Sequence, residues 1–330
     1  MAWHRYGTFT GGLDLPEDTG RTLNEPIEPL FVPPYLLVPL ALPGAPSATR
    51  LIEPGKTVRA GQVLAQGDGE TIPDILAPLS GRAAELTTAQ VALGGRFVPV
   101  EAMRLNSLQA DPPPDHAPFA QPWRQANGDD LLAFATESKL TTFRQPLMPL
   151  SEWLTQGRSA NTQTLILNAL ENQPYLTANH RLLVEYGPLV LTGLAILART
   201  LGASRVVLAV DQRRTKACAH LIVPANELGI ELIGLPHKYP LGADPILLRV
   251  ITGREVPQGR PSSDIHAAVI DPMTALAVAR WFSTGQHTLW RVVTLDGSQA
   301  RNARNLAVPL GTPCETLFEM PGVVLTHGGP

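Results

Sequence analysis

The sequence predicts an α/β protein of several domains, on three observations. From residue 31 to about 101, short apolar segments are broken by Pro and Gly, which is typical of a small β-barrel or sandwich. A Pro-rich stretch follows. Beyond it, apolar runs alternate with helical patterns, which predicts a mainly parallel sheet with crossover helices. A chain of 330 residues also exceeds the usual size of one core, so we expect two or three domains.

The N-terminal domain is predicted to span residues 1–105, with strands near 35–40, 63–65 and 97–100. The segments P-G-K-T-V-R-A-G-Q at 54–62 and A-P-L-S-G at 77–81 together resemble a barrel-sandwich hybrid of the biotinyl/lipoyl type. A carrier domain of that type attaches its prosthetic group to a Lys between these two segments. No Lys occurs from residue 65 to residue 78, so we expect a structural role instead.

Residues 106–130 contain Pro112, Pro113, Pro114, Pro118 and Pro122, and this composition predicts an extended linker. The central domain, residues 131–285, is predicted to be Rossmann-like. Its strands are expected at 164–168, 205–211, 230–235 and 267–271, and its main helices at 179–201 and 273–282. Ligands of such sheets bind beyond the carboxyl ends of the strands. The polar residues at those ends are Asn168, Asp211 and Asp271.

Composition excludes several classes of function. The net charge of -3, without a run of Lys or Arg, does not favour nucleic-acid binding. Two cysteines cannot form a disulfide framework or hold an iron–sulfur cluster by four thiolates. No G-x-S-x-G motif indicates a hydrolase. We also predict no metal site, because five scattered histidines show no i, i+3 or i+4 pairing: His180, His220, His237, His266 and His287.

The chain is expected to be cytoplasmic and soluble, and to dock peripherally on a membrane complex. The N-terminus shows no signal-peptide pattern. The most apolar stretch, residues 187–201, is interrupted by Thr192, Arg199 and Thr200, and it is shorter than the roughly 20 residues that span a bilayer.

One stretch carries a family resemblance. N-A-L-E-N-Q-P-Y-L-T-A-N-H-R at 168–181 is similar to the N-G-A-E-C-E-P-Y-L-T-A-D-H-R loop of the RnfC family, a component of the Rnf electron-transport complex that is related to the flavin subunit of respiratory complex I. T-F-T-G-G-L at 8–13, K-Y-P-L-G-A-D at 238–244 and T-G-R-E-V-P at 252–257 follow the same family's order. The resemblance implies that residues 286–330 form a small β-grasp module of the soluble-ligand-binding type (SLBB-like).

The flavin-binding features of that family are altered here. Its glycine-rich G-x-G-G-A-G-F-P-T-x-x-K loop corresponds to residues 129–156, which contain no Gly. Glycines let a phosphate approach backbone N–H groups closely. Its N-N-V-x-T segment is I-D-P-M-T at 270–274, and Asp271 would repel a phosphate. Its ferredoxin-like cysteine repeats are not among these residues. We therefore expect no FMN, no iron–sulfur cluster and no catalytic residue in this chain alone.

Six residues are the candidate remnant of the family's pocket: Asn168, Glu171, Gln173, Tyr239, Gly242 and Asp244, of which Gln173 and Asp244 stand where the family has Glu. They either satisfy backbone groups at a strand-to-helix turn or line a remodelled cleft for another small molecule. Two functional hypotheses remain. The first is a non-catalytic scaffold or docking adaptor that binds other protein subunits of a redox complex. The second is an electron-transfer subunit that binds a quinone or nucleotide, comparable to NqrA of the sodium-pumping NADH:quinone reductase.

Overall fold

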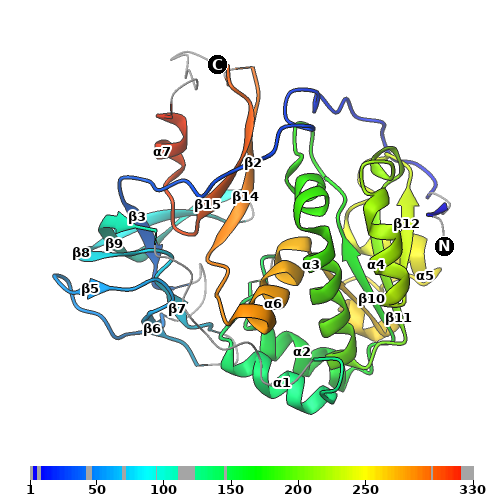
Figure 1. Ribbon diagram of the computed structural model, residues 1–330, viewed down its shortest axis with the longest axis horizontal. Coiled ribbons are helices and arrows are strands. Elements are labelled where there is room, and N and C mark those ends of the chain that lie inside the picture. Colours follow the sequence, from blue (N-terminus) through cyan, green and yellow to red (C-terminus); the bar gives the residue numbers. More distant parts are fainter. Residues whose placement is uncertain are drawn as a thin grey trace.

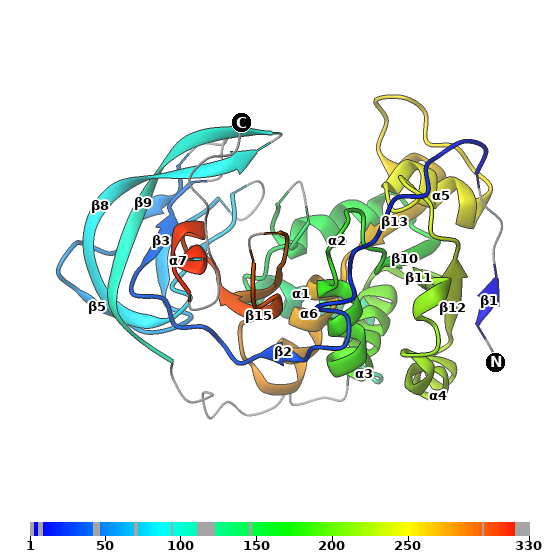
Figure 2. The same ribbon diagram turned by 90° about the horizontal axis from the view of Figure 1, so that it is seen from above.

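The computed structural model describes residues 3–5, 9–41, 47–68, 72–93, 95–110, 123–144, 147–298 and 300–320. A β-rich domain and an α/β domain lie on opposite sides, and a small C-terminal sheet lies between them (Figure 1). The N-terminal segment runs along the α/β domain before it reaches the β-rich domain (Figure 2).

The α/β domain is built on a five-stranded parallel sheet with the order β1–β12–β11–β10–β13. The strands are β1 (His4–Arg5), β10 (Thr164–Asn168), β11 (Arg205–Asp211), β12 (Ile230–Leu235) and β13 (Ala267–Ile270). The four longer strands lie where the sequence predicts them. Their apolar side chains are buried on both faces, as a parallel sheet covered by helices requires.

Two groups of helices cover this sheet. The helices are α1 (Gly128–Glu137), α2 (Leu150–Ser159), α3 (Ala178–Leu201), α4 (Ile222–Glu227), α5 (Asp244–Thr252) and α6 (Pro272–Thr284), with the short 3₁₀ turns η1 (Gln212–Arg214), η2 (Ala219–Leu221) and η3 (Ser262–Ile265). Helices α3 and α6 pack in the large core on one face, and α5 packs against the other face.

Helix α3 is the central support of the domain. It starts near the predicted residue and ends at Gly202, whose φ of 74° is the left-handed conformation that glycine adopts readily. It is long and apolar enough to cross a membrane, but 56% of its most apolar window is buried inside the protein. Gly193 lets it approach α6 closely, because a Cβ at Gly193 would lie 1.8 Å from the carbonyl oxygen of Ala275.

The N-terminal β-rich domain contains two sheets with the orders β3–β9–β8–β5 and β4–β6–β7. Its strands are β3 (Leu36–Pro39), β4 (Thr49–Arg50), β5 (Thr57–Val58), β6 (Val63–Gln66), β7 (Ile75–Leu76), β8 (Ser80–Leu93) and β9 (Arg96–Gln109). The predicted strand at 97–100 is part of the much longer β9, which forms a curved hairpin with β8 (Figure 2). The prolines of the predicted linker, 112–122, lie outside the described residues.

The C-terminal sheet combines two distant parts of the chain. Strand β14 (Trp290–Leu295) pairs with β15 (Arg304–Pro309), and β15 pairs in parallel with β2 (Ile27–Glu28); the short helix α7 (Cys314–Phe318) follows. The N-terminal domain was predicted to begin at residue 1, whereas β1 and β2 pair with strands of the other two regions. The soluble-ligand-binding β-grasp assignment for residues 286–330 stays a prediction.

Candidate functional site

A pocket lies at the carboxyl ends of β10, β11 and β12, with about 830 Å³ of empty space that is partly open to solvent. Its walls come from residues 169–174, residues 236–242, the start of α3 and the N-terminal segment 15–23. The lining includes four of the six predicted site residues, namely Glu171, Gln173, Tyr239 and Gly242. We call this space the sheet-edge pocket.

The side chain of Asn168 is hydrogen-bonded to the backbone of Gly242. The Asn168 side chain donates through Nδ2 to the carbonyl oxygen of Gly242 (2.8 Å), and its Oδ1 accepts from the N–H of Leu170 (3.2 Å). The side chain of Asn172 fills the space beside Gly242, since a Cβ on this glycine would lie 1.5 Å from its Oδ1. These contacts join the loop after β10 to the loop after β12.

Glu171 caps helix α3. Its Oε1 accepts from the backbone N–H groups of Asn179 (2.7 Å) and His180 (3.2 Å), while the N-cap residue Thr177 makes no capping hydrogen bond with its side chain. A carboxylate at a helix N-terminus is favoured by the helix dipole. Burial nevertheless raises the pKa of Glu171 to about 7, against the two backbone hydrogen bonds that lower it.

His180 also lines the pocket and is only 6% exposed. Its Nδ1 is buried and has no hydrogen-bond partner among the described residues. Burial, and to a smaller extent the positive charges of Arg214 and Arg181, lowers the pKa of His180 to about 4. The imidazole is therefore neutral at physiological pH.

Asp244 lies outside this lining and forms an ion pair with Arg144. Arg144 belongs to the glycine-free segment between α1 and α2. Several N–H groups of this segment are already bonded: Leu140 N donates to Ser138 Oγ (3.2 Å), Thr142 N to the carbonyl of Met148 (3.0 Å), and Phe143 N to Thr274 Oγ1 (2.8 Å).

The N-terminus of helix α6 is capped by the side chain of its N-cap residue. Asp271 is the N-cap, and its Oδ1 accepts from the N–H of Thr274 (2.9 Å) while its Oδ2 accepts from the hydroxyl of the same residue (2.5 Å). Such capping satisfies the free N–H groups that make a helix N-terminus an anion site.

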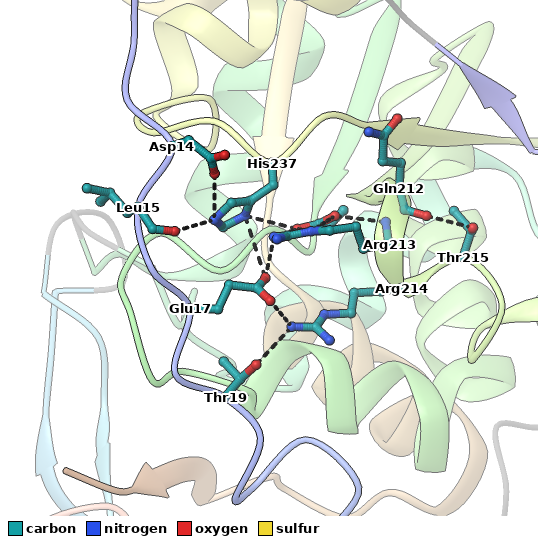
Figure 3. Close-up of polar contacts among 10 residues, drawn as sticks. Asp14, Leu15, Glu17, Thr19, Gln212, Arg213, Arg214, Thr215 and His237 are labelled. Atoms are coloured by element: carbon teal, nitrogen blue, oxygen red, sulfur yellow. Dashed lines mark hydrogen bonds and ion pairs between the residues drawn. The ribbon is translucent and has the colours of Figure 1, made fainter. Parts of the chain in front are cut away.

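A polar network that the sequence did not predict holds the N-terminal segment across the sheet edge (Figure 3). Residues 9–23, which we call the strap, contribute Glu17, and its carboxylate forms ion pairs with both Arg213 and Arg214. Arg213 also pairs with Asp211 (2.6 Å). The ring of His237 lies between Asp211 Oδ2 (3.1 Å from Nδ1) and the carbonyl of Leu15 (3.1 Å from Nε2).

Glu17, Asp211 and His237 also offer three ligand atoms within 4.8 Å of one another, a spacing that suits a metal ion. Burial disfavours ionisation of Asp211, but hydrogen bonds from Arg213 outweigh it and lower the pKa of Asp211. Because Arg213 and Arg214 already neutralise the two carboxylates, the group is best described as an ion-pair network that fastens the strap.

Two family models match this chain in sequence. Residues 7–103 match the RnfC barrel sandwich hybrid domain, and residues 147–280 match the Nuo51 FMN-binding domain of complex I. The chain therefore combines a barrel-sandwich hybrid domain with an α/β domain of the flavin-subunit type.

Curated relatives cover nearly the whole chain. It is 26% identical over 330 residues to the C subunit of the proton-translocating ferredoxin:NAD(+) oxidoreductase complex of Clostridium ljungdahlii, a match that covers 98% of this chain and 71% of the relative. It is 30% identical over 334 residues to the C subunit of the ion-translocating oxidoreductase complex of Edwardsiella ictaluri, covering 99% of this chain and 40% of the relative. The chain thus spans less than half the length of some of these relatives. It is an RnfC-like protein.

Among solved structures, an air-oxidized NAD+-reducing [NiFe]-hydrogenase is similar with a TM-score of 0.48 and 18% identity, over 60% of this chain and 41% of the hydrogenase chain. The H2-reduced state of such a hydrogenase gives a TM-score of 0.47 and 19% identity, over 60% of this chain and 40% of that one.

Proposed function

We propose that this chain is a non-catalytic adaptor in an Rnf-type redox complex, in which it binds other protein subunits and holds no flavin of its own. The similar proteins are named as C subunits of ion-translocating oxidoreductase complexes, which supports a place in an assembly of several subunits. A peripheral position on the cytoplasmic face of a membrane complex is part of this proposal.

The observation that carries the adaptor role is the state of the glycine-free segment. A flavin phosphate needs several free backbone N–H donors directed at it. In this segment, the N–H groups of Leu140, Thr142 and Phe143 are already used by the protein. The N-terminus of α6 is capped by Asp271, whose charge would repel a phosphate. These residues do not suit FMN.

A visible absorption spectrum tests the flavin part of this proposal. The full chain is purified, incubated with excess FMN and desalted. We expect no stoichiometric flavin band in the protein fraction, and FMN fluorescence should not be quenched on titration with protein. A flavin band that remains at a 1:1 ratio after desalting would show that the cleft binds the cofactor and would refute the adaptor role as stated.

Co-purification tests the proposed membership of a complex. A tagged chain expressed at its native level should bring defined partner subunits with it in fixed ratios, and they should be identified by mass spectrometry. A chain recovered alone under mild detergent and low salt would contradict a role in a complex.

A second candidate function is an electron-transfer subunit that binds a quinone or a nucleotide. The sheet-edge pocket favours it, because polar and apolar side chains line a recess at the carboxyl ends of the parallel strands, where ligands of such sheets bind. Thermal-shift measurements with NAD(H), ADP and a short-chain quinone distinguish this candidate from the adaptor, for which none of these compounds should raise the unfolding temperature.

A further inference from the structure

The sheet-edge pocket contains a carboxyl group whose hydrogen-bonding capacity is only half used. Oε1 of Glu171 accepts two backbone hydrogen bonds, whereas no hydrogen bond to its Oε2 is found among the described residues. The buried Nδ1 of His180, in the same lining, also has no partner there. A neutral imidazole nitrogen accepts or donates according to its tautomer, whereas a carboxylate oxygen only accepts, so Oε2 of Glu171 is the acceptor that a donor-rich ligand can satisfy.

The other carboxylates of the lining already have basic partners. Glu17 forms ion pairs with Arg213 and Arg214, and Asp211 forms one with Arg213. For Glu171, no ion pair is found within the described part of the chain, although the charge of Arg214 acts on it weakly. The pocket therefore contains one carboxyl group without a counter-cation, and an anionic ligand would meet three carboxyl groups in its walls.

The basic side chains nearby already donate hydrogen bonds to groups other than Glu171. Arg214 donates to Glu17 and to Thr19 (3.0 Å each), and Lys238 donates through Nζ to the carbonyl of Phe9 (3.0 Å) and lies 4.9 Å from the centre of its ring. These contacts direct both cations to the strap. A further cation can thus approach Glu171 without displacing an existing ion pair.

Exposed apolar and aromatic side chains occur in the pocket lining and on residues bonded to it. Tyr239, which lines the pocket, is 46% exposed, Tyr175 is 41% exposed and Leu13 is 61% exposed. Leu13 exchanges two backbone hydrogen bonds with Tyr239, and Tyr175 donates its N–H to the carbonyl of the lining residue Glu17; we call these three side chains the rim. Aromatic residues around a polar pocket are common at protein interfaces, and their rings attract cations.

We propose that the sheet-edge pocket binds an arginine side chain of a partner protein in the complex, whose guanidinium donates hydrogen bonds to the carboxylate of Glu171. A guanidinium has only donors, in a planar fork that fits a carboxylate. The exposed rim favours a protein partner over a free small cation, because a free cation would leave the rim uncovered. This inference rests on the proposed adaptor function and specifies the chemistry of the partner.

A titration of the full chain with N-acetyl-arginine amide at pH 8, followed by NMR or calorimetry, tests the pocket chemistry. N-acetyl-citrulline amide is the matched neutral control, because a urea group replaces the guanidinium. We expect the citrulline compound to bind at least about tenfold more weakly, as the loss of a charge-assisted hydrogen bond predicts. Equal binding of the two compounds, or tighter binding of N-acetyl-lysine amide, would overturn the proposal.

Two variants locate the binding. Glu171→Gln keeps an acceptor for the helix cap but removes the charge, and it should weaken the arginine compound about tenfold. Glu137→Gln removes an exposed carboxyl on α1 and should change nothing. Tyr239→Ser removes a rim side chain without altering the cap, so it supplies the test if Glu171→Gln does not fold. Unchanged binding in a folded pocket variant refutes the assignment.

Co-purification separates this inference from the proposed function. If the wild-type chain brings its partners and Glu171→Gln brings them equally well, the arginine pocket is refuted and the adaptor role stands. If the wild-type chain brings none, the adaptor role fails, and the titration with the arginine compound still decides the pocket chemistry. Loss of partners from Glu171→Gln alone, with Glu137→Gln unaffected, supports both.

Discussion

Replacing Glu171 by Gln should stabilise the α/β domain at pH 8 and leave its stability at pH 4.5 nearly unchanged. Burial raises the pKa of Glu171 from 4.5 to about 7, so folding at pH 8 requires an ionised carboxylate in an unfavourable environment. The glutamine is neutral at every pH, and its amide oxygen can still accept from the N–H groups of Asn179 and His180.

The magnitude follows from linkage. Between pH 4.5 and 7 the folded chain holds a proton on Glu171 that the unfolded chain has lost, so this group makes the wild type less stable as pH rises through that interval. A shift of this size corresponds to at most about 3 kcal/mol. Arg214 is the charged side chain that acts on Glu171, and the pocket lining also contains Glu17, Asp211 and Lys238. They are common to both proteins, as is the titration of His180.

Thermal unfolding at pH 4.5, 6 and 8 measures this effect. A difference of about 3 kcal/mol corresponds to roughly 6–12 °C in the unfolding temperature of a domain of this size. The temperature difference between Glu171→Gln and the wild type should grow with pH and level off above about pH 7. A constant difference, or a variant that loses stability at pH 8, would show that the capping charge matters more than its burial and would refute the reasoning.

Three further predictions concern the packing of helix α3, stability in acid, and the glycine-free segment between α1 and α2. Gly193→Ala should lower the free energy of unfolding, measured in urea, by about 3 kcal/mol, because its Cβ would meet a backbone carbonyl of α6. The Cβ of Gly187→Ala would meet the side chain of the buried Leu221, which can shift more easily than backbone, so this variant should cost less. As pH falls from 6.5 to 4, the wild type should lose up to about 3 kcal/mol of unfolding free energy relative to His180→Gln. The reason is that His180 takes up a proton in the unfolded chain over this interval, whereas burial keeps it neutral in the folded chain. Arg144→Ala should change stability by less than about 1 kcal/mol, because its ion pair is partly exposed, and it should not restore FMN binding, which fluorescence quenching can check.

The strands of the central sheet could be predicted because each is a mainly apolar run, and a polar residue, Asn168, Asp211 or Asp271, ends or follows three of them. Thr164–Asn168, Arg205–Asp211 and Ile230–Leu235 occur at the predicted positions. A parallel strand buried on both faces needs such a continuous run, and few other structures produce it. Helix α3 was predictable for the related reason that its apolar residues recur with the helical period.

The strap could not be predicted from the same patterns. Glu17 lies almost two hundred residues from Arg213 and Arg214 in sequence, and the strap has neither helical nor strand periodicity. The short strands on either side of it, β1 and β2, are two residues each and are defined by the sheets they join. The same holds for the pocket, whose lining combines four separate segments that only tertiary packing brings together.

The retained family residues do not by themselves argue for a cofactor. Asn168 holds the carbonyl of Gly242, and Glu171 holds the start of α3, so each has a structural task that any protein with this turn requires. Resemblance to the family at these positions is therefore evidence for a shared fold, and it is not by itself evidence for a bound cofactor. In the proposed function, the positions that decide whether a flavin phosphate binds are backbone donors in the segment between α1 and α2, where Thr142 and Phe143 already bond within the protein. The same distinction applies to the two oxygens of the Glu171 carboxyl group. Oε1 caps helix α3, so its presence reflects the fold, whereas the proposed binding of a ligand depends on Oε2.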